Sequence, residues 1–191
     1  MVLRKRHLLV NKEVKMEWVV TFINAAILAG ACDPYGLNRQ SKHKHVVQIV
    51  KFAENNQQDP YELLAIALIE SSLKPKAYSR TRDAGLFQVN CKWWQKSLHF
   101  KTRKECETQM FKPKVSIKAG SYILNHYRDK YKHCKGDLAY RCYNGGPGWP
   151  KSKNKHKIIK YQKKVTKRKE NLHKYYKDLV EEIRFQVKRR S

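Results

Sequence analysis

The stretch that most constrains the fold is residues 59–70, "DPYELLAIALIE". Asp59 is a good N-cap, Pro60 suits the first helical position, and Glu62 stands three residues after the cap, as a capping box requires. Residues 63–69 are all apolar, and Glu70 follows them. The pattern predicts a buried helix that ends on an acid, in a chain with only 16 acidic residues among 191.

Turn-forming residues follow this helix. Lys74-Pro75 stops it, because proline disfavours helix in the residue before it. Residues 77–85, "AYSRTRDAG", predict an ordered loop or a short hairpin, and residues 86–98, "LFQVNCKWWQKSL", predict a return to helix. Strand signals are confined to the loop after Glu70.

Other segments also have helical periodicity. One apolar face begins at His45 and includes Val46, Ile49 and Val50. Residues 112–131 predict a second helix, whose buried side is Val115, Ile117, Ala119, Tyr122, Ile123 and Tyr127. Residues 137–149, "DLAYRCYNGGPGW", begin as a helix and end in a glycine-proline turn. The chain is therefore expected to be mainly α, with its globular domain over residues 45–150.

Residues 1–44 form an N-terminal extension with two interpretations. Basic residues precede an uncharged run at 18–32, "WVVTFINAAILAGAC", which is similar to a signal peptide and loosely fits lipoprotein cleavage at Cys32. As a membrane span the run is short, since roughly 20 apolar residues are needed. The alternative, which we favour, is a retained core helix that leads into the domain.

Residues 151–191 form a basic C-terminal extension, with 16 basic and four acidic residues in a chain of net charge +26. Ile158, Val165, Leu172 and Leu179 recur every seven residues, which predicts an amphipathic helix. In one interpretation this helix packs on the domain and its lysines face the solvent. In the other, the helix binds a protein partner, an anionic membrane or nucleic acid.

The five cysteines include no CxxC pair and no Cys/His spacing typical of structural zinc. Four of them lie in the globular segment, and they can form two disulfides in three ways. Pairing of neighbours, Cys91 with Cys106 and Cys134 with Cys142, is our preference. Free buried thiols in a reducing compartment are the alternative.

Glu70 has the features of a general acid. Apolar surroundings disfavour the charged carboxylate and raise its pKa. A carboxyl that stays protonated near neutral pH can donate a proton to the leaving oxygen of a glycosidic bond. For Glu70 alone, a structural role in capping the following loop by hydrogen bonds is the simpler interpretation.

Two motifs favour the catalytic interpretation, because together they resemble the goose-type-lysozyme-like lytic transglycosylases. The first motif is Glu70-Ser71, Pro75, Ser79 and Gly85-Leu86-Phe87-Gln88-Val89, followed by Asn90. The second is Cys142-Tyr143-Asn144-Gly145-Gly146-Pro147-Gly148. "FKPKVSIKAGSYIL" and "VNCKWW" add to a resemblance that covers roughly residues 45–165. Phe87 stands where methionine is more usual, and Cys142 and Gly145 replace alanines, so no chemical group of the motifs is lost.

The resemblance implies a lysozyme-like fold of the α+β lysozyme superfamily and a role for each motif residue. Glu70 would act as general acid and then base on the bond between N-acetylmuramic acid and N-acetylglucosamine in peptidoglycan strands. Ser79 and Gln88, with Asn90, would hold the sugar. Tyr143 and Asn144 would orient Glu70 or the muramyl sugar. Trp93, Trp94 or Trp149 would stack on sugars, with core packing expected for at least one of Trp93 and Trp94. We expect no cofactor and no metal.

A second carboxylate decides between product types. Asp83 is the only other acid in the loop, and its simpler role is to stabilise the turn. We therefore expect a single-carboxylate mechanism in which the substrate's own acetamide or 6-hydroxyl replaces the nucleophile and leaves 1,6-anhydro ends. The alternatives are a lysozyme-type hydrolase that uses Asp83, and a basic structural protein that binds glycan without cleaving it.

The resemblance also suggests where such a protein works. Its lysine-rich chain and extra basic helix lead us to expect a phage virion component, internal or in the tail, that acts in the host periplasm. An alternative is a periplasmic or outer-membrane lipoprotein of a bacterium. In either setting the C-terminal helix could contact other virion or envelope-machine proteins.

Overall fold

The computed structural model describes residues 40–190, with the side chains of residues 42–175. The fold is mainly helical, as predicted. The longer helices are α2 (Gln40–Asn55), α3 (Pro60–Ser71), α5 (Arg103–Met110), α6 (Pro113–Lys130), α7 (Ala139–Gly145) and α8 (Lys155–Arg190). The short elements are β1 (Asp83–Ala84), β2 (Val89–Asn90), α4 (Cys91–Trp94), η2 (Lys132–Cys134), η3 (Gly136–Leu138) and η4 (Trp149–Lys151). None of the described helices is long and apolar enough to cross a membrane.

Helix α3 is the buried centre of the domain, as its sequence predicts. The Asp59 side chain accepts hydrogen bonds from the backbone N–H groups of Tyr61 and Glu62, and every residue from Pro60 to Leu68 is buried. The helix ends at Ser71 rather than at Lys74-Pro75, because Ser72 adopts a left-handed conformation and caps it.

Glu62 does not act as the capping-box partner that its spacing suggested. Its carboxylate accepts hydrogen bonds from Arg128 of α6, at 2.7 and 3.3 Å, and from the Tyr140 hydroxyl of α7, at 2.6 Å. Glu62 is buried, and these charge-assisted bonds offset the cost of burying it. The acid at the start of α3 therefore joins three helices.

The loop after α3 forms a hairpin that extends beyond residues 77–85, where an ordered loop or a short hairpin was predicted. Strands β1 and β2 pair antiparallel, with Asp83 opposite Asn90 and Ala84 opposite Val89. The predicted helix over residues 86–98 is wrong, since only Cys91–Trp94 are helical. Positive φ angles at Gly85 and Gln88 turn the chain into β2, and the Asn90 side chain then caps α4. Local turn chemistry therefore prevailed over the apolar pattern.

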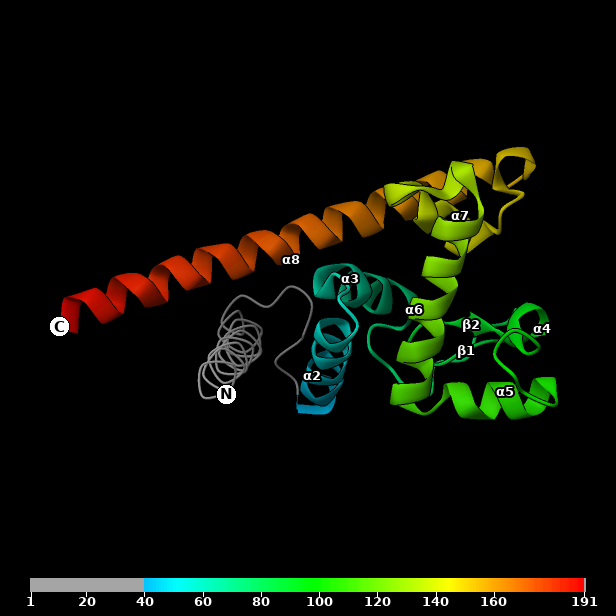
Figure 1. Ribbon diagram of the computed structural model, residues 1–191, viewed down its shortest axis with the longest axis horizontal. Coiled ribbons are helices and arrows are strands. Elements are labelled where there is room, and N and C mark those ends of the chain that lie inside the picture. The colour runs from blue at the N-terminus through cyan, green and yellow to red at the C-terminus, as the bar shows by residue number, and fades with distance from the viewer. Residues whose placement is uncertain (1–39, 191) are drawn as a thin grey trace, which may run out of the picture.

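Helices α6 and α8 follow most of their predicted buried faces. In α6, Ile117, Ala119, Ile123 and Tyr127 are buried, whereas Tyr122 is exposed, contrary to expectation. In α8, Ile158, Val165 and Leu172 are buried where the helix packs on α3 and α7. Figure 1 shows α8 starting beside α7, passing α3 and continuing past the rest of the described fold.

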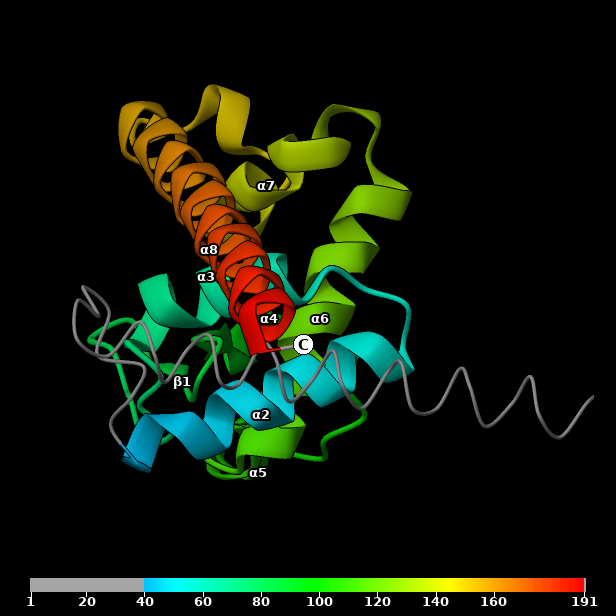
Figure 2. The same cartoon turned by 90° about the vertical axis from the view of Figure 1, so that its left-hand side faces the viewer.

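Figures 1 and 2 place α8 and α7 on the side of the domain opposite α2 and α5. The hairpin and α4 lie at one end, beside α6. Two predictions fall outside the described part of the chain. The N-terminal core helix and its alternative, cleavage at Cys32, concern residues before Gln40, and the side chain of Leu179 in the apolar stripe is not described.

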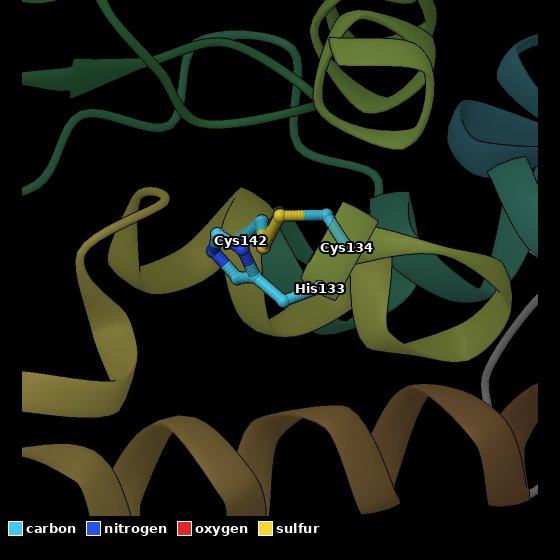
Figure 3. Close-up of side chains that lie close together, drawn as sticks. All are labelled: His133, Cys134 and Cys142. Carbon is cyan, nitrogen blue, oxygen red and sulfur yellow. A yellow bond between two sulfur atoms is a disulfide. The ribbon is translucent and has the colours of Figure 1, made fainter. Parts of the chain in front are cut away.

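Both preferred disulfides are present. Cys91–Cys106 joins the start of α4 to α5, and Cys134–Cys142 joins η2 to α7. Figure 3 shows the His133 ring beside the second bridge. Within the described residues, His133, Cys134 and Cys142 are the group of side chains closest to a metal-ligand arrangement. Their sulfurs are bonded to each other, so they offer no thiolate to a metal.

Candidate active site

A cleft of about 760 Å³ lies between the hairpin and the turn that follows α7. Glu70 lines it at the end of α3, and Asp83 lines it from the hairpin. Four further residues predicted from the motifs also line it, namely Gln88, Asn90, Tyr143 and Asn144. The fold thus brings two motifs that are more than 50 residues apart to one cavity.

Glu70 is partly buried, and its environment favours the protonated form. Loss of hydration on burial, aided by the nearby charge of Asp83, raises its pKa from 4.5 to about 7. A hydrogen bond from Tyr161 acts in the opposite direction, but it is the weaker influence. Near neutral pH Glu70 is therefore present in both its protonated and its charged form. A group that first donates a proton and then accepts one needs both forms.

Tyr161 of α8 is the residue that holds Glu70, and the sequence analysis missed it. Its hydroxyl donates to the Glu70 Oε1 atom at 2.5 Å. Burial raises the pKa of Tyr161 well above its ordinary value, so the group remains a neutral donor. One signal was available, because Tyr161 lies three and four residues from Ile158 and Val165 and so shares their buried face.

Asp83 is fixed in the hairpin by several donors. The Ser79 and Thr81 hydroxyls donate to its Oδ2 atom at 2.8 and 2.5 Å, and the Asn90 amide donates to Oδ1 at 2.6 Å. Ser79 also accepts from the Asp83 backbone N–H. Ser79 is not among the residues that line the cleft, and the hydroxyl expected to hold the sugar instead holds Asp83.

Gln88 and Tyr143 have structural partners as well as cleft positions. The Gln88 amide donates to the Ala77 and Gly85 carbonyls, at 3.1 and 3.0 Å. The Tyr143 hydroxyl donates to the Phe87 carbonyl at 2.7 Å, so it ties α7 to the hairpin turn. The hydroxyl that reaches Glu70 is that of Tyr161, whereas exposed Asn144 lines the cleft.

The tryptophans differ in position. Trp93 is 70% exposed and lines the cleft, so its ring can stack on a sugar. Trp94 also lines the cleft but is half-buried, with edge-on contacts to Tyr122, His126 and Tyr127. Trp149 is buried beneath the Arg141 guanidinium, 4.8 Å from its ring centroid, and packs in the core.

A disulfide and a hydrogen bond support the wall opposite the hairpin. Cys134–Cys142 anchors α7 one residue before Tyr143, and His133 Nε2 lies 2.7 Å from the Pro147 carbonyl oxygen. The two contacts hold the segment from Tyr143 to Pro147 at both ends. The turn that carries the second motif is therefore held in position at the cleft by the disulfide and the His133 contact.

Replacing Tyr161 with Phe is expected to shift the alkaline limb of the pH–rate profile to higher pH. The hydroxyl stabilises the charged form of Glu70, so its loss raises the Glu70 pKa above about 7. We expect turnover at neutral pH to fall roughly tenfold, because the carboxyl also loses its orientation. The measurement is kcat/KM against pH. An unshifted profile would contradict the assigned role, whatever the loss of rate.

The comparison with known families agrees with this geometry. The model of the transglycosylase SLT domain matches residues 48–170, well over half of the chain. The match includes Glu70, Asp83, Tyr143 and also Tyr161. No curated protein matches the chain significantly. The lysozyme-like helical fold and the protonatable Glu70 in the cleft agree with this match. The chain therefore belongs to the transglycosylase SLT domain family, whose members are lytic transglycosylases that act on peptidoglycan.

Proposed function

We propose that the protein cleaves the β-1,4 bond between N-acetylmuramic acid and N-acetylglucosamine and leaves a 1,6-anhydromuramyl end. The observation that carries the proposal is Glu70, whose pKa is raised to about 7 where it lines the cleft. The other cleft residues supply an exposed ring at Trp93 and an exposed amide at Asn144, which suit a sugar's face and its polar edge.

Glu70 serves both halves of the reaction. Protonated Glu70 gives its proton to the glycosidic oxygen while the bond to C1 of the muramyl sugar breaks. The carboxylate then accepts the proton of that sugar's 6-hydroxyl as O6 bonds to C1, so Glu70 ends protonated and no water is consumed. Between the two steps Glu70 is charged, and the Tyr161 hydrogen bond stabilises it most at that stage.

Hydrolysis is the second candidate, and the position of Asp83 is the observation that favours it. Asp83 lines the same cleft, and its charge contributes to the raised Glu70 pKa. A retaining or inverting hydrolase needs a second carboxylate as nucleophile or as base. However, the Asp83 oxygens already accept three side-chain hydrogen bonds. That arrangement suits a fixed negative charge that stabilises a cationic transition state better than it suits a nucleophile.

Mass spectrometry of the soluble muropeptides tests the proposal. Wild-type protein is expected to release anhydro products, each one water lighter than the corresponding reducing-end product. Asp83→Asn is expected to give the same products about tenfold more slowly, because it removes the stabilising charge and one of the two oxygens that accept hydrogen bonds in the hairpin. Reducing-end products from the wild-type protein would replace the proposal with hydrolysis. Loss of all products in Asp83→Asn alone would make Asp83 part of the chemistry.

We further propose that the enzyme acts in the periplasm, as a virion component delivered there or as an exported protein. Two disulfides support an oxidising place of action, because bridges of this kind are rare in the cytosol. The strongly basic chain, at +26, also suits a particle filled with nucleic acid. Thiol trapping on protein recovered from its working compartment is the test, and four free thiols at Cys91, Cys106, Cys134 and Cys142 would contradict it.

A further inference from the structure

The outer side of α8 carries a row of lysines. Six of them are exposed, and we call them the lysine ridge: Lys157, Lys160, Lys163, Lys164, Lys167 and Lys174. At about 100° per residue they fall within an arc of about 120°. That arc lies opposite Ile158, Val165 and Leu172, which are buried against the domain. The ridge is about 26 Å long and points away from the fold, and α8 lies at the edge of the described structure (Figures 1 and 2).

The ridge lysines have no partner in the part of the chain that the structure describes. None of its ion pairs or side-chain hydrogen bonds involves one of their ammonium groups, whereas Lys169, on the buried flank of α8, pairs with Asp59 at 3.4 Å. Glu170 is the single acid between residues 155 and 175. The first five ridge lysines stand three or four residues from a neighbour, and like charges at those spacings destabilise a helix. The ridge therefore lowers the stability of α8, which indicates a role outside folding.

The shape and charge of the ridge suit duplex DNA. A line of ammonium groups without acids attracts an anion that is itself a line of charge. Duplex DNA has one negative charge per about 1.7 Å of its axis. Its major groove, about 12 Å wide, admits an α-helix, which is about 10–12 Å across with its side chains. Contacts from ammonium groups to phosphates position a protein on the duplex but carry no sequence information.

An anionic membrane suits the ridge less well. A helix that binds a bilayer inserts its apolar face among the lipids, with its lysines on the polar face. In α8 the residues of that apolar face, Ile158, Val165 and Leu172, are buried against the domain. A membrane would therefore meet only the charged side of a convex helix.

We propose that the lysine ridge binds duplex DNA without regard to sequence, with α8 lying in the major groove. None of the described residues of α8 lines the cleft, so the ridge and the cleft are separate surfaces. The inference goes beyond the proposed function and does not depend on it, because DNA binding is measured without any glycan. It gives the enzyme a second polymeric ligand besides peptidoglycan.

Four substitutions remove the centre of the ridge and keep the helix, because glutamine and lysine have similar helix propensities. This ridge variant is Lys157→Gln, Lys160→Gln, Lys164→Gln and Lys167→Gln. Affinity for a fluorescent DNA duplex of about 20 base pairs, which is longer than the ridge, is measured at several salt concentrations. Loss of four phosphate contacts should reduce the slope of log affinity against log salt by about 3.6 and weaken binding roughly a hundredfold at about 50 mM salt.

A control variant loses the same charge on the side of the domain away from α8. Its four sites are exposed and lie in or next to α5 and α6. The substitutions are Lys101→Gln, Lys104→Gln, Lys114→Gln and Lys118→Gln. It should keep the wild-type salt slope and bind DNA within about threefold of wild type. Both variants should release muropeptides like wild type. The ridge variant should unfold at no lower a temperature than wild type, because it loses repulsion between lysines.

Two other ligands complete the test. An RNA duplex of the same length has a deep, narrow major groove that side chains cannot read, so wild-type affinity for it should be at least about tenfold lower at equal salt. Equal affinities for the two duplexes, or equal losses of DNA binding in the two variants, would overturn the proposal in favour of general attraction to charge. Vesicles of phosphatidylglycerol represent the membrane. If the ridge variant lost vesicle binding but kept DNA binding, the proposal would be wrong and the partner would be a membrane.

Discussion

Glu70→Gln is expected to lower muropeptide release by at least about a thousandfold, which is the largest effect on activity that we predict. Glutamine keeps the shape of the side chain and can still accept the Tyr161 hydrogen bond, but it has no proton to give to the leaving oxygen. Asp83 does not replace it, since three side-chain donors hold its carboxylate in the hairpin. The measurement is mass spectrometry of products from purified peptidoglycan.

Stability provides the control for that loss. The folded pKa of Glu70, about 7, lies above the 4.5 of the unfolded group, so wild-type stability falls as pH rises through this range. Glutamine has no such charge to bury. Glu70→Gln should therefore match the wild-type free energy of unfolding near pH 4 and exceed it near pH 8, by at most about 3 kcal/mol. An inactive variant that is less stable at pH 8 would point to misfolding instead.

The same titration sets the pH dependence of wild-type activity. Turnover requires protonated Glu70 at the start, so kcat/KM should fall tenfold per pH unit well above about 7. This limb should vanish from the residual activity of Glu70→Gln.

Local signals predicted the helix that positions Glu70 and the turn that follows it. Asp59 and Pro60 identify the start of α3 because capping depends on a few neighbouring atoms. An ordered loop or short hairpin over residues 77–85 was expected for the same reason, although β2 lies beyond that range. The apolar setting of Glu70 also follows from sequence, because seven apolar residues precede it. For the start of α3 and the setting of Glu70, neighbours in the chain decide the structure, and there the sequence was sufficient.

Two sets of contacts between distant segments were not predicted. Tyr161 is 91 residues from Glu70, and only the packing of α8 on α3 joins them. Glu62 was assigned to a local cap, but Arg128 and Tyr140 bind it from other helices. The helix expected over residues 86–98 failed for a local reason instead, because the positive φ angles at Gly85 and Gln88 turn the chain, and the spacing of apolar residues does not indicate such turns.

Gly85→Ala is expected to produce the largest loss of stability, roughly 3 kcal/mol or more. Gly85 has φ +80°, and an added Cβ atom would lie 2.0 Å from the Met110 carbonyl oxygen and 2.8 Å from Ser116 Oγ. The first of these atoms is backbone at the end of α5, so side-chain rotation cannot relieve the contact. The hairpin would have to move away from α5 and α6, and Asp83 and Asn90 would move with it.

Gly136→Ala is the matched control, because it separates backbone strain from this contact. Gly136 also has a positive φ, +53°, but an added Cβ atom would meet nothing within 4 Å. It should cost only about 1 kcal/mol, the penalty of the left-handed conformation itself. Thermal or denaturant unfolding measures both variants. If Gly85→Ala lost no more stability than Gly136→Ala, the close packing of the hairpin against α5 would be refuted. A larger loss, together with reduced cleavage, would show that this packing holds the Asp83 side of the cleft in place.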